Sequence, residues 1–280
     1  MDKHELQKIA VKIREGALTA VYSASSGHPG GSLGIADLLA YLYFNEMRVD
    51  PKNPRDPDRD RFVLSKGHTC PAYYAALALK GFFPFEDLKT FRHKDSIYQG
   101  HPDMKHIPGV DMSSGSLGQG ISAACGMALA GLISEKKYRV WTILGDGECE
   151  EGEVWEAAMF AAHYGLNNLC AFVDANGLQI DGPVEEVMNV APLDEKFKAF
   201  GWNVLVIDGH DFDEIDAAVK NAKASLKPTA VICRTVKGKG VSYMENQCSW
   251  HGKAPNAEQY EQGMRELLEA EKALDEVRVH

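Results

Sequence analysis

The sequence predicts an α/β fold in which a parallel sheet is covered by helices on both faces. Apolar runs at 138–144, 169–173, 203–207 and 230–236 alternate with stretches of helical periodicity. These runs are apolar on both faces, which is typical of parallel strands buried between two layers of helices. No internal repeat, low-complexity tract or linker interrupts the 280 residues, so we expect a single domain over residues 1–280.

The elements before residue 113 follow from local patterns. An amphipathic helix is predicted at the N-terminus, where apolar residues recur at helical spacing: Leu6, Ile9, Ala10, Ile13, Ala17, Ala20 and Val21. The segment SSGHPGGSLG (25–34) predicts a loop, and 36–44 a buried helix. The Pro- and charge-rich residues 50–61 predict a surface loop. A short strand at 62–64, the turn SKGH and a helix over PAYYAALAL follow.

From residue 113 the alternation becomes regular. SSGSLGQGISAACGMALAGLIS predicts a Gly-rich turn that opens a helix of small residues. The turn GDGECEEG follows the strand at 138–144, and a helix is expected over 153–164. The turn DANGLQIDG follows the strand at 169–173. Helical patterning at 213–226 separates the last two apolar runs, and a polar helical run covers 256–278.

Composition and charge exclude several classes of protein. The chain is 45% hydrophobic and 25% charged, as in ordinary globular proteins, and its net charge of −10 disfavours a nucleic-acid or anionic-membrane surface. No apolar run approaches the roughly 18 residues that span a bilayer, and the charged N-terminus predicts no secretory signal. The six cysteines form no CxxC pair, which indicates reduced residues of a cytoplasmic protein. Acidic neighbours should raise the thiol pKa of Cys149, so we expect no nucleophile there.

Two turns at the carboxyl edge of the predicted sheet carry oxygen ligands. Asp146 lies in GDG and Asn176 in DANG, thirty residues later, which is the length of one strand–helix–strand unit. This spacing brings both side chains to adjacent strand ends, where open α/β sheets bind ligands. With a nearby carbonyl they predict a hard-oxygen site for magnesium or calcium, completed by a phosphorylated ligand. The alternative is two ordinary Asp-Gly and Asn-Gly turns.

Four of the ten histidines lie in Gly- or Pro-rich loops. They are His28 in SGHPGGS, His68 in SKGH, His101 in QGHPD and His251 in SWHGK. Imidazole near neutral pH carries protons, donates hydrogen bonds or contacts phosphate, so these loops predict a crowded polar pocket. The alternative is four solvated loop residues. Their separation excludes a short zinc motif. No role is expected for the other six: His4, His93, His106, His163, His210 and His280.

Together these motifs resemble the N-terminal half of transketolase. GDG followed by Asn after about thirty residues is the thiamine diphosphate binding pattern, which pyruvate dehydrogenase and acetolactate synthase relatives share. The histidine loops separate transketolase from them. The motifs SGHPGGSLG, LSKGH, GHPD, SSGSLGQG, LGDGECEEGEVWEA and NGLQIDG occur in the family's order and cover nearly the whole chain.

The resemblance implies roles for individual residues. The metal, normally magnesium, would be held by Asp146, Asn176 and the carbonyl of Leu178, which stands where isoleucine is common. Diphosphate contacts are implied for Gly147, His68 and His251, with Asn176 also on the cofactor side. A strip beside the aminopyrimidine ring is implied for Gly115, Ser116 and Leu117, although the family usually has proline at the position of Ser116.

The catalytic histidines implied by the resemblance are His28, His101 and His251, which would surround the reactive thiazolium. They would bind substrate hydroxyls and move protons. Glu151 and Glu156 match acidic residues of the dimer interface. Their alternative role is that of solvated residues in a first helical turn, where the helix dipole favours negative charge.

The chain is less than half as long as a full transketolase, which has three domains. The resemblance therefore implies the N-terminal subunit of a two-chain transketolase, completed by a separate C-terminal subunit in a heterotetramer with two of each chain. The expected reaction moves a two-carbon ketol unit from a ketose phosphate to an aldose phosphate. Two alternatives stay open: a specialised ketose, such as a sulfosugar or a branched pentulose phosphate, and a noncatalytic subunit that retains the fold.

Overall fold

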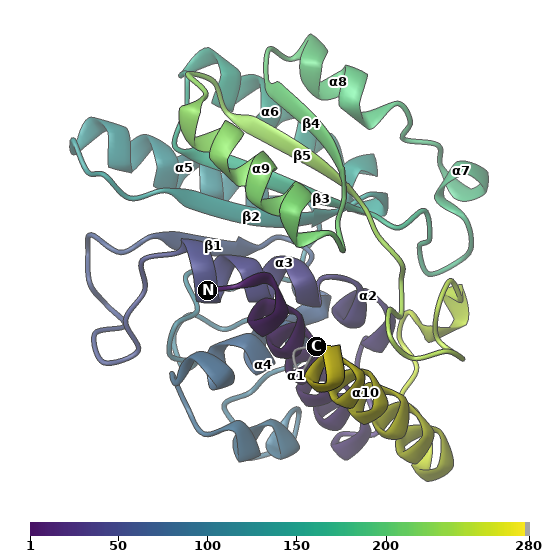
Figure 1. Ribbon diagram of the computed structural model, residues 1–280. Coiled ribbons are helices and arrows are strands. Elements are labelled where there is room, and N and C mark those ends of the chain that lie inside the picture. Colours follow the sequence, from purple (N-terminus) through teal and green to yellow (C-terminus); the bar gives the residue numbers. More distant parts are fainter. Residues whose placement is uncertain (278–280) are drawn as a thin grey trace.

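Five parallel strands form the centre of the molecule in the order β1-β2-β3-β5-β4 (Figure 1). The computed structural model describes residues 1–277. The strands are β1 (Arg61–Leu64), β2 (Val140–Gly145), β3 (Leu169–Ala175), β4 (Asn203–Asp208) and β5 (Thr229–Arg234). Every pair of neighbours runs parallel, and in the central pair Gly145 lies opposite Asp174. The predicted parallel sheet is confirmed.

Helices cover both faces of this sheet, as predicted. One face carries α1 (Lys3–Ser23), α3 (Ala36–Tyr41), α4 (Cys70–Lys80) and α9 (Phe212–Ala224). The other carries α5 (Gln119–Ile133), α6 (Gly152–His163) and α8 (Leu193–Ala199). The remaining helices are the short α2 (Pro29–Gly34) and α7 (Val184–Val187), and α10 (Ala257–Val277), which packs along α1 (Figure 1).

The strands divide their side chains between two hydrophobic cores because successive residues of a strand point to opposite faces. In β3, Cys170 and Phe172 enter the core beneath α1, α3 and α4, whereas Ala171 and Val173 enter the core beneath α5 and α6. Phe172 is fully buried and stacks on Trp141 of β2, with 6.2 Å between ring centroids. A continuous apolar run such as 169–173 therefore fills both cores.

The helix ends follow ordinary capping rules. Asp2 and Glu5 form a capping box at the start of α1, each side chain accepting from the other residue's backbone N–H. The C-terminal end of α4 is Lys80, and the helix is capped by Gly81, whose φ of +99° suits glycine.

Helix α10 packs on α1 through aromatic side chains: Tyr22 of α1 stacks on Tyr260 of α10, with ring centroids 4.1 Å apart. The polar helical run expected over 256–278 is thus α10, and Arg278 lies outside the described residues.

The structure corrects three details of the sequence prediction. Residues Pro29–Gly34, expected within a loop, form α2, because Pro29 suits the first turn of a helix and the glycines pack closely against neighbouring segments. The helix expected over 36–44 changes after Tyr41 into a π-helical turn at Leu42–Glu46. Strand β4 lies at the sheet edge and is only partly covered, with Val206 43% exposed.

Two further expectations concern the thiols and the absence of a membrane-spanning helix. All six cysteines are free and five are buried. Burial, reinforced by Glu148 and Asp146, raises the pKa of the Cys149 thiol well above its ordinary value, as the sequence predicted. Within residues 1–277, no helix is long and apolar enough to cross a membrane.

Replacing Phe172 with alanine tests the packing of the central strand. We expect Phe172→Ala to lower the free energy of unfolding by about 3 to 5 kcal/mol, because a buried aromatic ring leaves a cavity. The measurement is urea unfolding followed by circular dichroism. Leu226→Ala is the control, since Leu226 is 84% exposed. Equal stabilities of the two variants would contradict the packing described here.

Candidate functional site

The predicted site residues gather around one cavity of about 310 Å³ at the carboxyl edge of β1, β2 and β3. Asp146 follows β2 and Asn176 follows β3, which are neighbours in the sheet. The expectation that thirty residues would bring these two side chains to adjacent strand ends is met. The predicted residues that line the cavity are His28, His68, Gly115, Leu117, Asp146, Gly147, Glu151, Asn176, Leu178 and His251.

Asp146 is a buried carboxylate held by backbone amides. Its Oδ1 accepts from the N–H of Gly147 at 2.8 Å, and its Oδ2 accepts from the N–H of Gly177 at 2.6 Å. Burial, together with the negative charge of Asp174, raises the pKa of Asp146 to about 6. A cation placed beside this carboxylate would relieve both effects, because an opposite charge favours the ionised form.

The other two expected metal ligands lie on the turn after β3. Asn176 donates from Nδ2 to the carboxylate of Asp174 at 2.9 Å and accepts at Oδ1 from the N–H of Leu178 at 3.0 Å. The carbonyl of Leu178 accepts from Nζ of Lys237 at 2.9 Å. Carboxylate, amide and carbonyl oxygens are the donors that magnesium prefers, so the residues present fit such an ion.

The four predicted histidines form one cluster at the cavity. The ring of His28 lies 5.1 Å from that of His68, 5.5 Å from that of His251 and 6.3 Å from that of His101. The rings of His68 and His251 are 5.0 Å apart. His101 does not line the cavity itself but packs beside Gly115. The prediction of a crowded polar pocket agrees with this arrangement.

Burial favours the neutral form of all four imidazoles. It lowers the pKa of His28 to about 4, assisted by Arg92, and that of His251 to about 3, assisted by Lys237. Burial also lowers the pKa of His68 and of His101. Nδ1 of His28 is buried and has no hydrogen-bond partner among the described residues. Such an atom is costly unless a water or ligand satisfies it.

A glycine allows the His68 turn to approach the strip at 115–117. A Cβ at residue 67 would lie 2.7 Å from Oγ of Ser114, so only glycine lets the two segments touch. Within the strip, Gly115 and Leu117 line the cavity. Ser116 lies between them but is exposed and outside the lining.

The two expected interface glutamates occupy different places. Glu151 immediately precedes α6 and lines the mouth of the cavity. Glu156 lies on α6, exposed and away from the cavity. Their assignment to a dimer interface stays a prediction.

Lys237 is a site residue that the sequence analysis did not single out. Its Nζ lies between the carbonyl of Leu178 and Nδ1 of His251, which is 3.0 Å away. Burial, with the nearby charge of Lys66, lowers the pKa of Lys237 to about 8. The available signal was the Gly-rich stretch VKGKG, which begins two residues after β5, at the sheet edge where open α/β sheets bind ligands.

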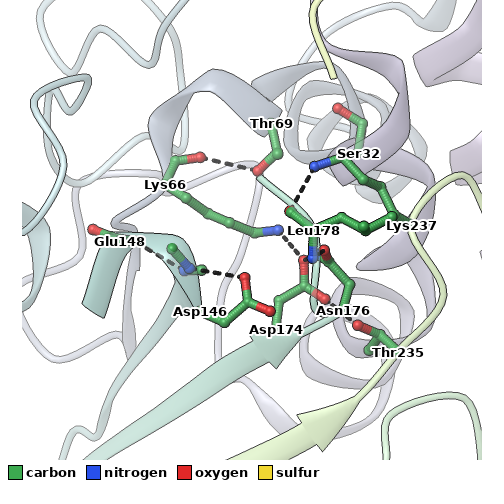
Figure 2. A network of polar contacts seen from close by, with 12 residues as sticks. Ser32, Lys66, Thr69, Asp146, Glu148, Asp174, Asn176, Leu178, Thr235 and Lys237 are labelled. Atoms are coloured by element: carbon green, nitrogen blue, oxygen red, sulfur yellow. Dashed lines mark hydrogen bonds and ion pairs between the residues drawn. The ribbon is translucent and has the colours of Figure 1, made fainter. Parts of the chain in front are cut away.

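A buried ion pair beneath the cavity also escaped the sequence analysis. Figure 2 shows the ammonium of Lys66 beside the carboxylate of Asp174, which Thr235 and Asn176 also contact. Lys66 is 2% exposed and Asp174 is fully buried. Burial alone would raise the pKa of Asp174, but Lys66 and the hydrogen-bond donors hold it below its ordinary value.

The buried carboxylate of Glu148 also joins separate segments of the site through hydrogen bonds. Its Oε1 accepts from Oγ of Ser65 at 2.5 Å and from the N–H of Gly118 at 2.9 Å. Its Oε2 accepts from the N–H of Gly145 at 3.0 Å. One carboxylate therefore joins the ends of β1 and β2 to the turn that precedes α5.

Comparison with known proteins identifies relatives along nearly the whole chain. Residues 6–273 match the family described as transketolase, thiamine diphosphate binding domain. The 6-deoxy-6-sulfo-D-fructose transketolase subunit SqwG of a Clostridium species is 48% identical, over 94% of this chain and 96% of that protein. An apulose-4-phosphate transketolase subunit of Phocaeicola vulgatus is 41% identical, over 98% of each chain.

Longer transketolases match over less than half of their length. The transketolase of Homo sapiens is 42% identical over 95% of this chain, which spans 43% of the human protein. The crystal structure of transketolase from Campylobacter jejuni superposes with a TM-score of 0.90 and 32% identity, over 98% of this chain and 46% of that one.

Removing Lys66 tests the buried ion pair. We expect Lys66→Met to lower the free energy of unfolding by about 3 to 5 kcal/mol, because it leaves the carboxylate of Asp174 buried without its counter-charge. Lys136→Met is the matched control: Lys136 pairs with Asp58, and both side chains are exposed, so this ion pair should contribute little to stability. Urea unfolding measures both, and a loss at Lys66 no larger than at Lys136 would refute the role of this pair.

Proposed function

We propose that this chain, which belongs to the transketolase family of thiamine diphosphate binding domains, is the cofactor-binding subunit of a two-chain transketolase. One observation carries the proposal: the chain corresponds almost end to end with two proteins named as transketolase subunits. It spans less than half of the longer transketolases. We expect a second subunit to supply further contacts to the cofactor and the substrate.

The cavity offers contacts for both the metal and the diphosphate. Asp146, Asn176 and the Leu178 carbonyl would hold a divalent cation, normally magnesium. Lys237 and the backbone at Gly147 would meet the diphosphate, since the former is a buried cation and the latter leaves room for close approach. His68 and His251 would supply further contacts beside Lys237.

Thiamine diphosphate, when bound, supplies the nucleophilic carbon that cleaves and re-forms a carbon–carbon bond beside the ketose carbonyl. The residues of this chain orient the substrate and handle its protons. Burial favours the neutral form of His28, His101 and His251, and a neutral imidazole can both accept and donate a hydrogen bond. The unpartnered Nδ1 of His28 suits a substrate hydroxyl.

A second chain would complete the cavity. Leu117 and Ile180 line its mouth and are 36% and 63% exposed, and Glu150 and Glu151 lie beside them. Apolar side chains exposed at the rim of a polar site favour contact with another protein surface. We expect a heterotetramer with two copies of each subunit, in which Glu151 and Glu156 lie at an interface.

For the substrate we favour a specialised ketose, as in the relatives that act on 6-deoxy-6-sulfo-D-fructose and apulose 4-phosphate. These two relatives match this chain over more than nine-tenths of both lengths, and the first is 48% identical to it whereas human transketolase is 42% identical. The second candidate is the ordinary exchange between ketose and aldose phosphates. A noncatalytic role is disfavoured, because the histidine cluster and both oxygen ligands are intact.

An assay of ketol transfer tests the proposal. This chain, alone and with the product of the neighbouring gene, is supplied with magnesium, thiamine diphosphate and ribose 5-phosphate as acceptor. The donors are 6-deoxy-6-sulfofructose, apulose 4-phosphate and xylulose 5-phosphate. We expect activity only in the mixture, and highest with one of the first two donors. Preference for xylulose 5-phosphate would refute the specialised substrate, and activity of the lone chain would refute the need for a partner.

Two substitutions separate cofactor binding from turnover. We expect Asp146→Ala to abolish thiamine diphosphate binding, because Asp146 is the carboxylate among the three proposed protein ligands of the metal. His28→Ala should mainly lower kcat, by about 10²-fold or more, as loss of a proton-handling group does. Calorimetry and steady-state kinetics on the assembled complex measure these effects. Asp95→Ala is the control, since Asp95 is exposed and outside the cavity lining. Unchanged cofactor affinity in Asp146→Ala would contradict the metal assignment.

A further inference from the structure

We propose that Arg92 is a positioning residue for the proposed ketol transfer, because its guanidinium ties the turn before His28 to the turn before His101 and presents a permanent positive charge to both imidazoles. The inference rests on the proposed function. Arg92 is half-buried and does not line the cavity, so it would act through the two histidines.

Two hydrogen bonds from the Arg92 guanidinium link the two turns. Nη1 of Arg92 donates to Oγ of Ser26 at 2.6 Å, and Nη2 donates to the carbonyl of Gly100 at 3.4 Å. Ser26 lies two residues before His28, and Gly100 immediately precedes His101. One planar side chain therefore links two segments that are far apart in sequence, and sets the distance between the imidazoles they carry.

The backbone around Arg92 is shaped to present this side chain. Arg92 has a φ of +59°, in the left-handed region that residues other than glycine seldom adopt. Its N–H donates to the carbonyl of Tyr98 at 2.9 Å, which closes the intervening loop. A Cβ at residue 100 would overlap Nε of Arg92, so the guanidinium has room only because residue 100 is glycine. Conformations of this kind persist where the surroundings hold them.

No carboxylate neutralises this guanidinium among residues 1–277. Its Nε is buried and has no hydrogen-bond partner there. The positive charge of Arg92 therefore acts on the two nearby imidazole rings. Burial is the largest cause of the lowered pKa of His28 and of His101, and the charge of Arg92 is the second largest. An arginine is suited to this task because its own charge does not titrate.

The other groups around the two imidazoles supply no compensating negative charge. His28 faces His101, His68, His251 and Lys237, all neutral or positive. Near His101, Asp103 is engaged by the ring of His106 and by the N–H of Lys105. Without Arg92 both imidazoles would protonate at higher pH, and a protonated imidazole cannot accept a hydrogen bond from a substrate hydroxyl.

The test is a histidine titration on the full chain, followed by ¹H–¹⁵N NMR and assigned with His28→Gln and His101→Gln. In the wild type, we expect His28 to stay neutral down to pH values near its pKa of about 4. In Arg92→Gln, both midpoints should rise by about one pH unit, because a like charge has been removed. Arg92→Lys keeps the charge, so its midpoints should match the wild type. Lys94→Gln is the control, since it removes an exposed positive charge from the same loop.

Kinetics on the assembled two-chain enzyme test the tie itself. We expect Arg92→Lys to lower kcat about tenfold, because a lysine cannot bridge both turns as the guanidinium does, while the acid limb of the pH profile stays in place. In Arg92→Gln, the acid limb should also move to higher pH. Lys94→Gln should change neither kcat nor the profile.

Specific outcomes would overturn the proposal. Unchanged histidine midpoints in a folded Arg92→Gln chain would refute the electrostatic role. Wild-type kcat in Arg92→Lys would refute the tie, and this variant serves even if Arg92→Gln does not fold. The titration requires neither a partner nor a substrate, so its result stands even if every donor fails in the transfer assay and the proposed function is wrong.

Discussion

The arrangement of the cavity depends on a charge pair placed in the interior of the sheet edge. Lys66 follows β1, Asp174 is the penultimate residue of β3 and Thr235 follows β5, so one carboxylate connects three strand ends (Figure 2). The same carboxylate accepts from Asn176, which fixes the turn on which the expected metal ligands lie. A buried pair of this kind contributes little net stability, but loss of either partner is severe. The role of this ion pair is to hold the three strand ends, and the turns that follow them, in their positions relative to one another.

The sheet and the pairing of Asp146 with Asn176 were predictable because both depend on short-range patterns. A strand buried on both faces is apolar throughout, and one strand–helix–strand unit has a nearly constant length. These two facts predict that the ends of β2 and β3 lie side by side, and in the structure Gly145 lies opposite Asp174. The direction of the Cys149 pKa shift was equally predictable, since the acidic neighbours that contribute to it are adjacent in sequence.

The supporting contacts were not predictable, because each joins segments that the sequence does not relate. Lys66 and Asp174 are 108 residues apart, and Lys237 meets the carbonyl of Leu178 across 59 residues. Nothing local distinguishes Lys66 from a solvated lysine, and the Gly-rich stretch around Lys237 does not indicate which residues that lysine contacts. The helix at Pro29–Gly34 was missed for a related reason: its glycines are poor helix formers, and tertiary packing overrides that preference.

The uneven burial of the cysteines allows a fluorescent label to be attached beside the site. Five thiols are enclosed, and burial raises the pKa of each, which makes them slow to react. Cys248 is partly exposed and lies three residues before His251. A maleimide dye would therefore attach at one position without any cysteine being engineered away. The fluorescence of the dye would then report on changes near the histidine cluster, which has no chromophore of its own.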